Sequence, residues 1–299
     1  MNAIEIENLD FSYSTKETLL QNVNMTVPQG SIYGFLGVNG AGKTTLLKLI
    51  LNLLKSKGKG SIKVLGKDTQ THHPQYLSQI GSLIEEASIY KHLTAKENLK
   101  LWSNYHNTAA SKIEEVLETV GLSHATNKKV QAFSTGMKQR LGIGITLMHE
   151  PKILILDEPT NGLDPIGIND LRDLLHTLSA QGKTIILSSH ILPEVEKLVD
   201  HVGILKQGSI IYEGTLKELN NSTLLGSSIT ARVENVELAK QHLDTHFNTT
   251  IVDGQLKISI ETPTDINRAV RLLIDNDIQL HELTQEKKSL ESIFLNLAK

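Results

Sequence analysis

The chain has 299 residues and a formal net charge of −3, which is enough length for two ordinary domains and too little positive charge for a broadly basic nucleic-acid surface. The sequence has no cysteine, which excludes disulfides, thiolate catalysis and cysteine-ligated zinc and suits a reducing compartment. No run approaches the roughly 18 apolar residues that cross a bilayer, and the acidic N-terminus is not a secretory signal, so we expect a cytoplasmic chain.

The first predicted elements are strands. Apolar and polar residues alternate over residues 4–7 and 23–27, which is the period of half-exposed strands. A continuous apolar stretch at residues 31–36 then predicts a buried strand that enters a glycine-rich loop, and residues 46–51 predict the helix that leaves it. A strand, a loop and a helix in this order form the usual setting of a phosphate-binding loop.

The loop itself has the phosphate-binding pattern of two glycines, a lysine and a hydroxyl residue. Its residues are Gly37, Val38, Asn39, Gly40, Ala41, Gly42, Lys43 and Thr44, followed by Thr45. Glycine reaches the backbone angles that let N–H groups converge on an anion, and the helix adds its positive end. Lys43 would reach the outer phosphates, and the Thr44 hydroxyl would bind Mg²⁺. We therefore expect a nucleoside triphosphate with Mg²⁺, rather than a chance match in a glycine-containing loop.

The apolar period changes to that of helices between about residues 88 and 150. A stripe at i, i+3, i+4 and i+7 predicts one such helix, formed by Ile113, Val116, Leu117 and Val120. Continuous apolar runs at residues 153–156 and 184–187 then predict strands buried on both faces of a parallel sheet. A hairpin about Gln207-Gly208 follows. We expect an α/β domain over residues 1–220 that includes this helical region.

A second domain, residues 221–299, is predicted after a linker at residues 221–223 and 226–228, where Asn, Ser, Thr and Gly predominate. Its pattern reads strand, helix, two strands, helix, a strand near Ile278 and a last helix after Ser289. That order suggests a small ferredoxin-like α+β unit. It contains no catalytic constellation, so a regulatory, dimer-bracing or merely structural role is open, and its apolar faces favour bracing.

Two acidic residues, Asp157 and Glu158, directly follow the buried strand at residues 153–156. Both carboxylates would emerge at the carboxyl edge of the sheet, where ligands bind in α/β folds. Asp157 would then bind Mg²⁺, and Glu158 would polarise or deprotonate the attacking water. Alone, the pair could be a solvated surface turn, but beside a phosphate loop it predicts a hydrolytic site.

Residues 133–140, Phe-Ser-Thr-Gly-Met-Lys-Gln-Arg, resemble the signature motif of ATP-binding cassette (ABC) proteins, usually Leu-Ser-Gly-Gly-Gln. Ser134 and Gly136 are kept, while the other three positions depart. Ser134 is also a good helix cap, which is the structural alternative. In this family the signature faces ATP held by a partner subunit. The resemblance therefore implies a head-to-tail dimer with two nucleotides between its chains.

Further motifs follow in the family's order. Residues 162–164 resemble the loop that meets the partner subunit, with Asp164 at its end, and residues 188–190 resemble the histidine switch. The resemblance gives His190 a contact with the γ-phosphate. Tyr13 lies where the family's adenine-stacking aromatic lies, with an ordinary strand aromatic as the alternative. We expect five other histidines to be solvated or capping, namely His72, His73, His92, His106 and His201.

The chain departs from the family at the loop joining the core to the helical region. The usual residue there is a glutamine that contacts Mg²⁺ with a neutral oxygen, and here it is Glu85, or Glu86 after a shift of one residue. A carboxylate would bind the metal more strongly but bring negative charge near the γ-phosphate, so its two effects oppose each other. This glutamate and the small C-terminal domain resemble the branch that exports bacitracin, lantibiotics and related peptides for self-protection.

The resemblance covers about residues 1–220 and implies a P-loop cassette with a RecA-like parallel sheet core, an antiparallel β subdomain and a helical subdomain. The implied function is the ATP-hydrolysing subunit of an ABC exporter. Its implied partners are a separate integral-membrane permease and a second copy of itself or a paralogous cassette. The permease would hold it at the inner face of the membrane, and residues near 88–98 would transmit closure to it.

Two other classes of protein fit the sequence less well. A soluble ABC ATPase acting on ribosomes or nucleic acid would tend to have two cassettes or a long coiled coil, and this chain has one cassette and neither a heptad run nor a basic block. A P-loop GTPase is expected to contain the motif Asn-Lys-x-Asp. Residues 127–130 begin with Asn-Lys but lack the aspartate.

Overall fold

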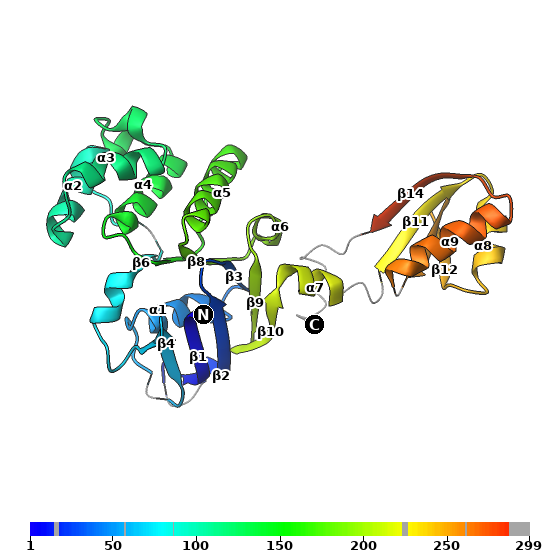
Figure 1. Cartoon of the computed structure of the whole chain (residues 1–299), viewed down its shortest axis with the longest axis horizontal. Coiled ribbons are helices and arrows are strands. Elements are labelled where there is room, and N and C mark those ends of the chain that lie inside the picture. The colour runs from blue at the N-terminus through cyan, green and yellow to red at the C-terminus, as the bar shows by residue number, and fades with distance from the viewer. Residues whose placement is uncertain (15–17, 57, 86, 223–226, 261, 287–299) are drawn as a thin grey trace. The chain divides into compact units, whose positions relative to one another are not determined.

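The chain divides into two compact units, Met1–Thr215 and Leu216–Lys299 (Figure 1). The computed structural model describes residues 1–14, 18–56, 58–85, 87–222, 227–260 and 262–286. The division falls just before helix α7 (Leu216–Ser222), whereas the sequence suggested a boundary after residue 220.

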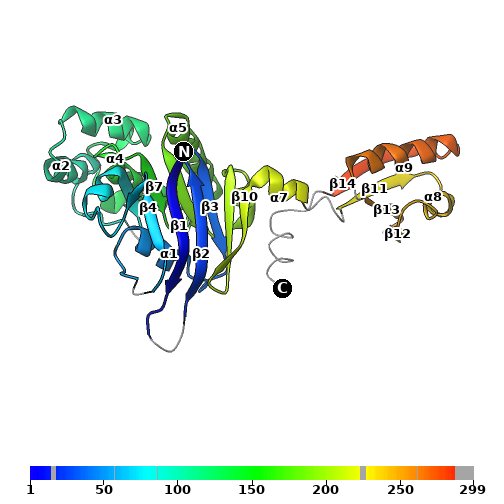
Figure 2. The same ribbon diagram turned by 60° about the horizontal axis from the view of Figure 1, so that its bottom comes forward.

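One antiparallel sheet of the first unit has the strand order β2-β1-β4-β5. Its strands are β1 (Asn2–Phe11), β2 (Leu20–Pro28), β4 (Ser61–Val64) and β5 (Lys67–Asp68). Strands β1 and β2 run side by side along most of their length (Figure 2). The alternating apolar residues predicted here, among them Ile4, Ile6 and Met25, are all buried in the core of this unit. The period-two pattern is thus confirmed.

The second sheet of this unit has the order β10-β9-β3-β8-β7-β6. Strands β6 to β9 and β3 are parallel, and only β10 runs antiparallel, beside β9. The strands are β3 (Ile32–Gly37), β6 (Ile80–Leu83), β7 (Ile153–Leu156), β8 (Thr184–Ser189), β9 (His201–Lys206) and β10 (Ser209–Thr215). Every residue of β3, β7 and β8 is buried, because both faces of the sheet are covered. The prediction of a buried parallel core is confirmed.

The register of the parallel strands brings the functional loops together. Leu156 pairs with Leu187, and Leu36 pairs with Ser189, so β3, β7 and β8 end at one edge of the sheet. The phosphate loop follows β3, and the acidic pair follows β7. Helices α1 (Lys43–Ile50), α5 (Pro165–Ala180) and α6 (Leu192–Glu196) and the short η1 (Gln75–Gln79) belong to this core.

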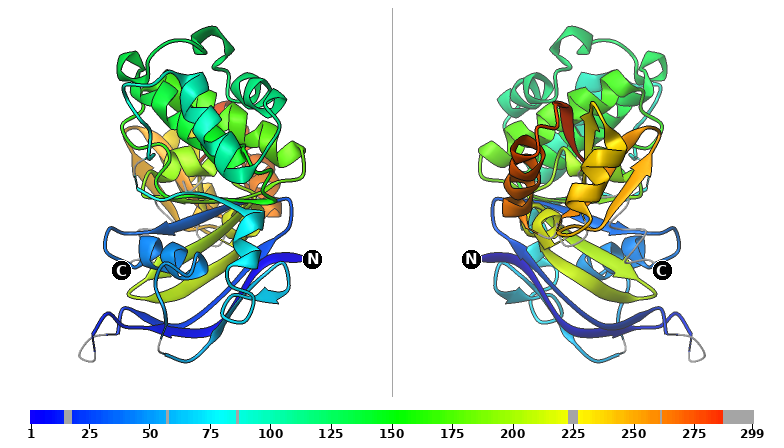
Figure 3. Two further views of the ribbon diagram at one scale, coloured as in Figure 1. Left: turned by 90° about the vertical axis from the view of Figure 1, so that its left-hand side faces the viewer. Right: turned by 90° about the vertical axis from the view of Figure 1, so that its right-hand side faces the viewer.

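The helical region between β6 and β7 forms its own group (Figure 3). It contains α2 (Ala95–His106), η2 (Ser123–Ala125), α3 (Ser111–Thr119), η3 (Val130–Ala132) and α4 (Thr135–Leu147). A capping box starts α2, in which Thr94 and Glu97 exchange hydrogen bonds. The predicted stripe from Ile113 to Val120 is buried, which confirms the helical period.

The second unit contains a four-stranded antiparallel sheet in the order β12-β13-β11-β14. Its elements after α7 are β11 (Ser227–Val233), α8 (Val236–Leu243), β12 (Thr249–Val252), β13 (Gln255–Ile260), α9 (Pro263–Asp275) and β14 (Leu280–Glu286). A core of its own includes Ile229, Leu256, Ile258, Ala269 and Leu273. The predicted last helix after Ser289 lies outside the described residues.

The predicted linker is wrong at both of its ends. Asn221 and Ser222 complete α7, and Ser227 and Ser228 begin β11. Ser228 pairs with Ser259 on one side and Glu286 on the other, so ladder hydrogen bonds outweigh the low strand preference of serine. The rest of the linker prediction, residues 223–226, lies outside the described residues.

Candidate nucleotide site

The phosphate loop turns tightly between β3 and α1, and two of its glycines are required by the backbone. Gly40 and Gly42 have φ of 81° and 107°, in the left-handed region that other residues enter at a cost. A Cβ on Gly42 would also lie 2.8 Å from the Leu20 side chain. Gly42 caps α1, and its carbonyl accepts the Leu46 N–H at 2.9 Å. The first N–H groups of α1 are therefore left for an anion.

Lys43 places its ammonium inside this loop. The side chain is buried and donates to the carbonyls of Gly37 at 2.7 Å and Val38 at 3.4 Å. The ammonium also lies 3.7 Å from Glu158 Oε1. A buried cation held by carbonyls and facing one carboxylate can meet a phosphate oxygen without leaving the loop.

Asp157 is buried and its carboxylate joins three elements. Thr44 Oγ1, on α1, donates to Oδ2 at 2.7 Å, and Ser188 Oγ, on β8, donates to Oδ1 at 2.5 Å. Ser188 also accepts the N–H of Glu158 at 2.9 Å. Sequence reasoning gave Ser188 no role of its own, although its place at the end of the strand beside β7 was a usable signal. The alternative of two solvated carboxylates in a surface turn is wrong for Asp157.

The oxygens of Thr44 and Asp157 fit Mg²⁺, which prefers hard oxygen ligands and keeps several waters. Over the ranges that the structure describes, no cluster of three His, Cys, Asp or Glu side chains could bind a metal ion. Thr44 and Asp157 would thus supply only part of the coordination, and phosphate oxygens and water would supply more of it.

Glu158 and His190 face each other across the ends of β7 and β8. His190 Nδ1 donates to Glu158 Oε2 at 2.7 Å, and the side chains are 43% and 19% exposed respectively. Glu158 has a left-handed φ of 48°, a conformation that is costly for a glutamate and often marks a functional site. Glu158 thus lies between the cation Lys43 and the imidazole of His190.

Lys43, Thr44, Glu158 and His190 line one cavity of about 430 Å³, together with Asn39, Gly40 and Asn161. Asn161 was not singled out in the sequence, although it directly precedes the loop at residues 162–164. Tyr13 lies beside Thr45, with its hydroxyl 3.1 Å from Thr45 Oγ1 and its ring packed edge-on against Phe11 at 4.9 Å. The structure therefore brings Tyr13 to the phosphate-loop helix while the residue is 64% exposed.

Three predicted site residues lie apart from this cavity at the starts of two helices. Ser134 caps α4 and accepts the Met137 N–H at 3.2 Å, and Asp164 caps α5 and accepts the Gly167 N–H at 2.7 Å. Neither they nor Gly136 are among the described residues that line the Lys43 cavity. Both caps leave free N–H groups at a helix start, which suit an anion.

Glu85 is exposed and pairs with Lys48 of α1, with 2.7 Å between Oε1 and Nζ. This hydrogen bond is the main cause that raises the pKa of Lys48 and lowers the pKa of Glu85. Glu85 also lines a cavity of about 500 Å³ that Asp157, Glu158 and Asn161 share. Glu86, the match after a shift of one residue, lies outside the described residues.

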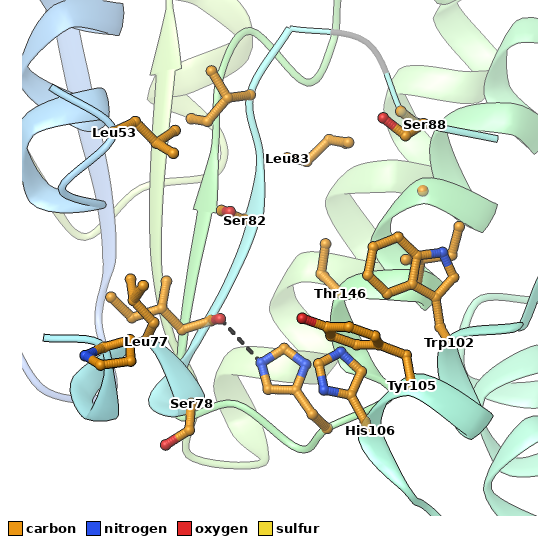
Figure 4. Close-up of a pocket in the computed structure, with 17 residues that line it drawn as sticks. Leu53, Leu77, Ser78, Ser82, Leu83, Ser88, Trp102, Tyr105, His106 and Thr146 are labelled. Atoms are coloured by element: carbon orange, nitrogen blue, oxygen red, sulfur yellow. Dashed lines mark hydrogen bonds between the residues drawn. The ribbon is translucent and has the colours of Figure 1, made fainter.

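A separate groove of about 760 Å³ lies between the sheet edge at β6 and helices α2 and α4 (Figure 4). His106 lies in it, stacked between Trp102 and His149 with ring centroids 6.0 and 4.5 Å away. Burial lowers the pKa of both histidines. His106 is the half-buried last residue of α2, and His149 lies just after α4, so rings from distant parts of the sequence meet here.

The comparisons with known proteins agree on one family. Residues 20–161 match the family described as ABC transporter. The bacitracin transport ATP-binding protein BcrA of Bacillus licheniformis is 41% identical over 300 residues, which cover 98% of this chain and 96% of BcrA. The lantibiotic transport ATP-binding protein SrtF of Streptococcus pyogenes is 46% identical over 228 residues, which cover 74% of this chain and 97% of SrtF.

Among solved structures, cbiO1 of Clostridium perfringens, part of an ABC transporter complex, matches with a TM-score of 0.69 at 26% identity. The match covers 82% of this chain and 96% of that chain. Because the similarity to BcrA runs through nearly all of both chains, this chain belongs to the ABC transporter family, as an ATP-binding subunit whose ATPase activity is coupled to transport.

Proposed function

We propose that the chain drives export of an antimicrobial peptide or a similar amphiphile through an integral-membrane permease. Similarity supports the cargo class, because relatives at 41% and 46% identity are described as bacitracin and lantibiotic transport proteins. The observation that carries the catalytic part is the meeting of Lys43, Asp157, Glu158 and His190 at one sheet edge, where hydrolysis of bound ATP would take place.

Glu158 is proposed as the general base. Its carboxylate would accept a proton from a water molecule as the water oxygen attacks the γ-phosphorus and ADP leaves. His190 would orient the γ-phosphate while it keeps Glu158 in place, and Lys43 would bind the outer phosphate oxygens. Thr44 and Asp157 would hold Mg²⁺, which would neutralise part of the phosphate charge.

The residues at the starts of α4 and α5 are proposed to act on a nucleotide bound by a second copy. Ser134, Gly136 and Asp164 match family motifs that contact the partner subunit or its ATP. They lie outside the Lys43 cavity of their own chain. Free N–H groups at helix starts favour phosphate. A head-to-tail dimer would bring these groups to the partner's triphosphate, and Tyr13 would stack on the adenine.

The groove beside β6 is proposed to receive a cytoplasmic helix of the permease. Its wall is largely apolar, with Leu83, Trp102 and Tyr105 on it (Figure 4). Ile84 and Ala87 line the groove, while Glu85 and Ala87 line the cavity that Asp157 and Glu158 share. One segment therefore borders both spaces, so a helix in the groove would respond to changes at the nucleotide.

A membrane partner would also supply the attachment to the bilayer. None of the helices in the described ranges is long and apolar enough to cross a membrane. We propose that the chain sits at the cytoplasmic face of the membrane through the permease.

The C-terminal unit is proposed to be ferredoxin-like and to brace the dimer. Its order of elements is strand, helix, two strands, helix, strand, and its sheet order places β11 and β13 centrally, which supports the ferredoxin-like assignment. A buried core of its own supports a packing role.

Replacing Glu158 by glutamine tests the catalytic proposal. The Glu158→Gln chain should retain ATP binding and hydrolyse ATP about 10²- to 10⁴-fold more slowly, because the amide cannot accept the proton. Steady-state phosphate release and equilibrium ATP binding measure the two properties. Glu118→Gln, an exposed change on α3, is the control and should hydrolyse normally. Brisk turnover by Glu158→Gln would rule out the general-base role.

Replacing Tyr105 by glutamate tests the docking groove. Tyr105 lines the groove yet is 78% exposed, so the new charge should not disturb the fold but should weaken binding of an apolar helix. The amount of permease that co-purifies with the chain should fall several-fold, while the ATPase activity of the isolated chain is unchanged. Leu101→Glu, also exposed on α2 but outside the groove lining, is the matched control. Equal capture of the permease by both variants would refute the assignment.

Ending the chain at Thr215 tests bracing. In a Glu158→Gln background, the truncated cassette should still bind ATP but should dimerise with ATP at least several-fold more weakly, as measured by sedimentation. A dimer of unchanged affinity would eliminate the bracing role.

A further inference from the structure

Glu85 poses a charge problem at the proposed site. The carboxylates of Asp157 and Glu158 line the same cavity as Glu85, together with the lysines Lys91 and Lys138, and a triphosphate would add more negative charge. A neutral glutamine would avoid this cost. The structure offers a different solution, because a cation from the phosphate-loop helix reaches the Glu85 carboxylate.

We propose that Lys48 is a positioning residue, a counter-ion that lets Glu85 take the place of a neutral glutamine beside the metal and the γ-phosphate. The proposal rests on the proposed Mg²⁺ site and on the metal contact that the family resemblance implies for Glu85, and it goes beyond both by assigning Lys48. Lys48 Nζ lies 2.7 Å from Glu85 Oε1, the distance of a charge-assisted hydrogen bond. The pair has no net charge, as glutamine has none.

The backbone fixes the two partners relative to each other. Lys48 lies on α1, whose first residue is Lys43, so its position is tied to the phosphate loop. On the other side, the Leu83 carbonyl accepts the Asp157 N–H at 2.8 Å, which ties the end of β6 to the acidic pair. Glu85 follows in a left-handed conformation with φ 64°. Lys48 contacts Oε1, so Oε2 would remain for the metal.

An ordinary surface ion pair is the competing explanation. The Glu85 side chain is 68% exposed and that of Lys48 is 30% exposed, and such pairs contribute little to stability. The two explanations differ in what they affect. A surface pair would leave nucleotide binding unchanged, whereas a counter-ion would change binding of ATP with Mg²⁺ and would do so only while residue 85 is charged.

The test is a double-mutant cycle read by equilibrium binding. Full-length chains in a Glu158→Gln background are titrated with ATP at fixed Mg²⁺, without a permease. Lys48→Met should weaken binding by about 5- to 10-fold, because an uncompensated carboxylate then faces the triphosphate. Lys48→Arg should restore most of the affinity. Lys48→Met combined with Glu85→Gln should bind within about 2-fold of Glu85→Gln alone.

Two outcomes would overturn the proposal. Binding unchanged in Lys48→Met would identify an ordinary surface pair, and an equal loss with and without Glu85→Gln would mean that Lys48 acts independently of Glu85. Lys100→Met, an exposed change on α2, controls for loss of a lysine charge and should bind normally. If the Glu158→Gln parent itself failed to bind ATP, the proposed function would be contradicted instead. Because no permease is present, neither the cargo nor permease docking affects the measured binding.

Discussion

The buried carboxylate of Asp157 is the group on which the rest of the site depends. The Thr44 hydroxyl donates a hydrogen bond to Oδ2 at 2.7 Å, and the Ser188 hydroxyl donates one to Oδ1 at 2.5 Å. A buried carboxylate needs such partners, so the start of α1 and the ends of β7 and β8 are held together. Ser188 also accepts the Glu158 N–H, which extends the same constraint to the proposed base.

Two lysines at this edge are each paired with a carboxylate. Lys43 lies 3.7 Å from Glu158, and Lys48 lies 2.7 Å from Glu85. A triphosphate that binds Lys43 would compete with Glu158 for the ammonium and so free the carboxylate to meet water. On this account, binding of nucleotide itself prepares Glu158, and the segment around Glu85 carries the change toward the groove beside α2 and α4.

Sequence patterns predicted the parts of the fold that local periodicity determines. The buried runs of β7 and β8 and the stripe of α3 follow from the spacing of apolar residues, and parallel strands must end at one edge. The pairing of Lys48 with Glu85 and the stacking of His106 on His149 could not be predicted, because they join distant residues through side-chain conformation. The linker prediction was wrong for a related reason, because β11 pairs with β13 and β14, which lie far along the chain.

Each ATP site is proposed to form from one chain's phosphate loop and another chain's signature motif. The chain lacks cysteine, so no native thiol would compete with introduced ones. Two exposed positions can be replaced by cysteine, Asn39 in the loop and Thr135 beside Ser134. In a Glu158→Gln chain carrying both replacements, oxidation with ATP and Mg²⁺ should give a disulfide-linked dimer, and oxidation without ATP should give little. Monomers that stay unlinked with ATP bound would contradict the account.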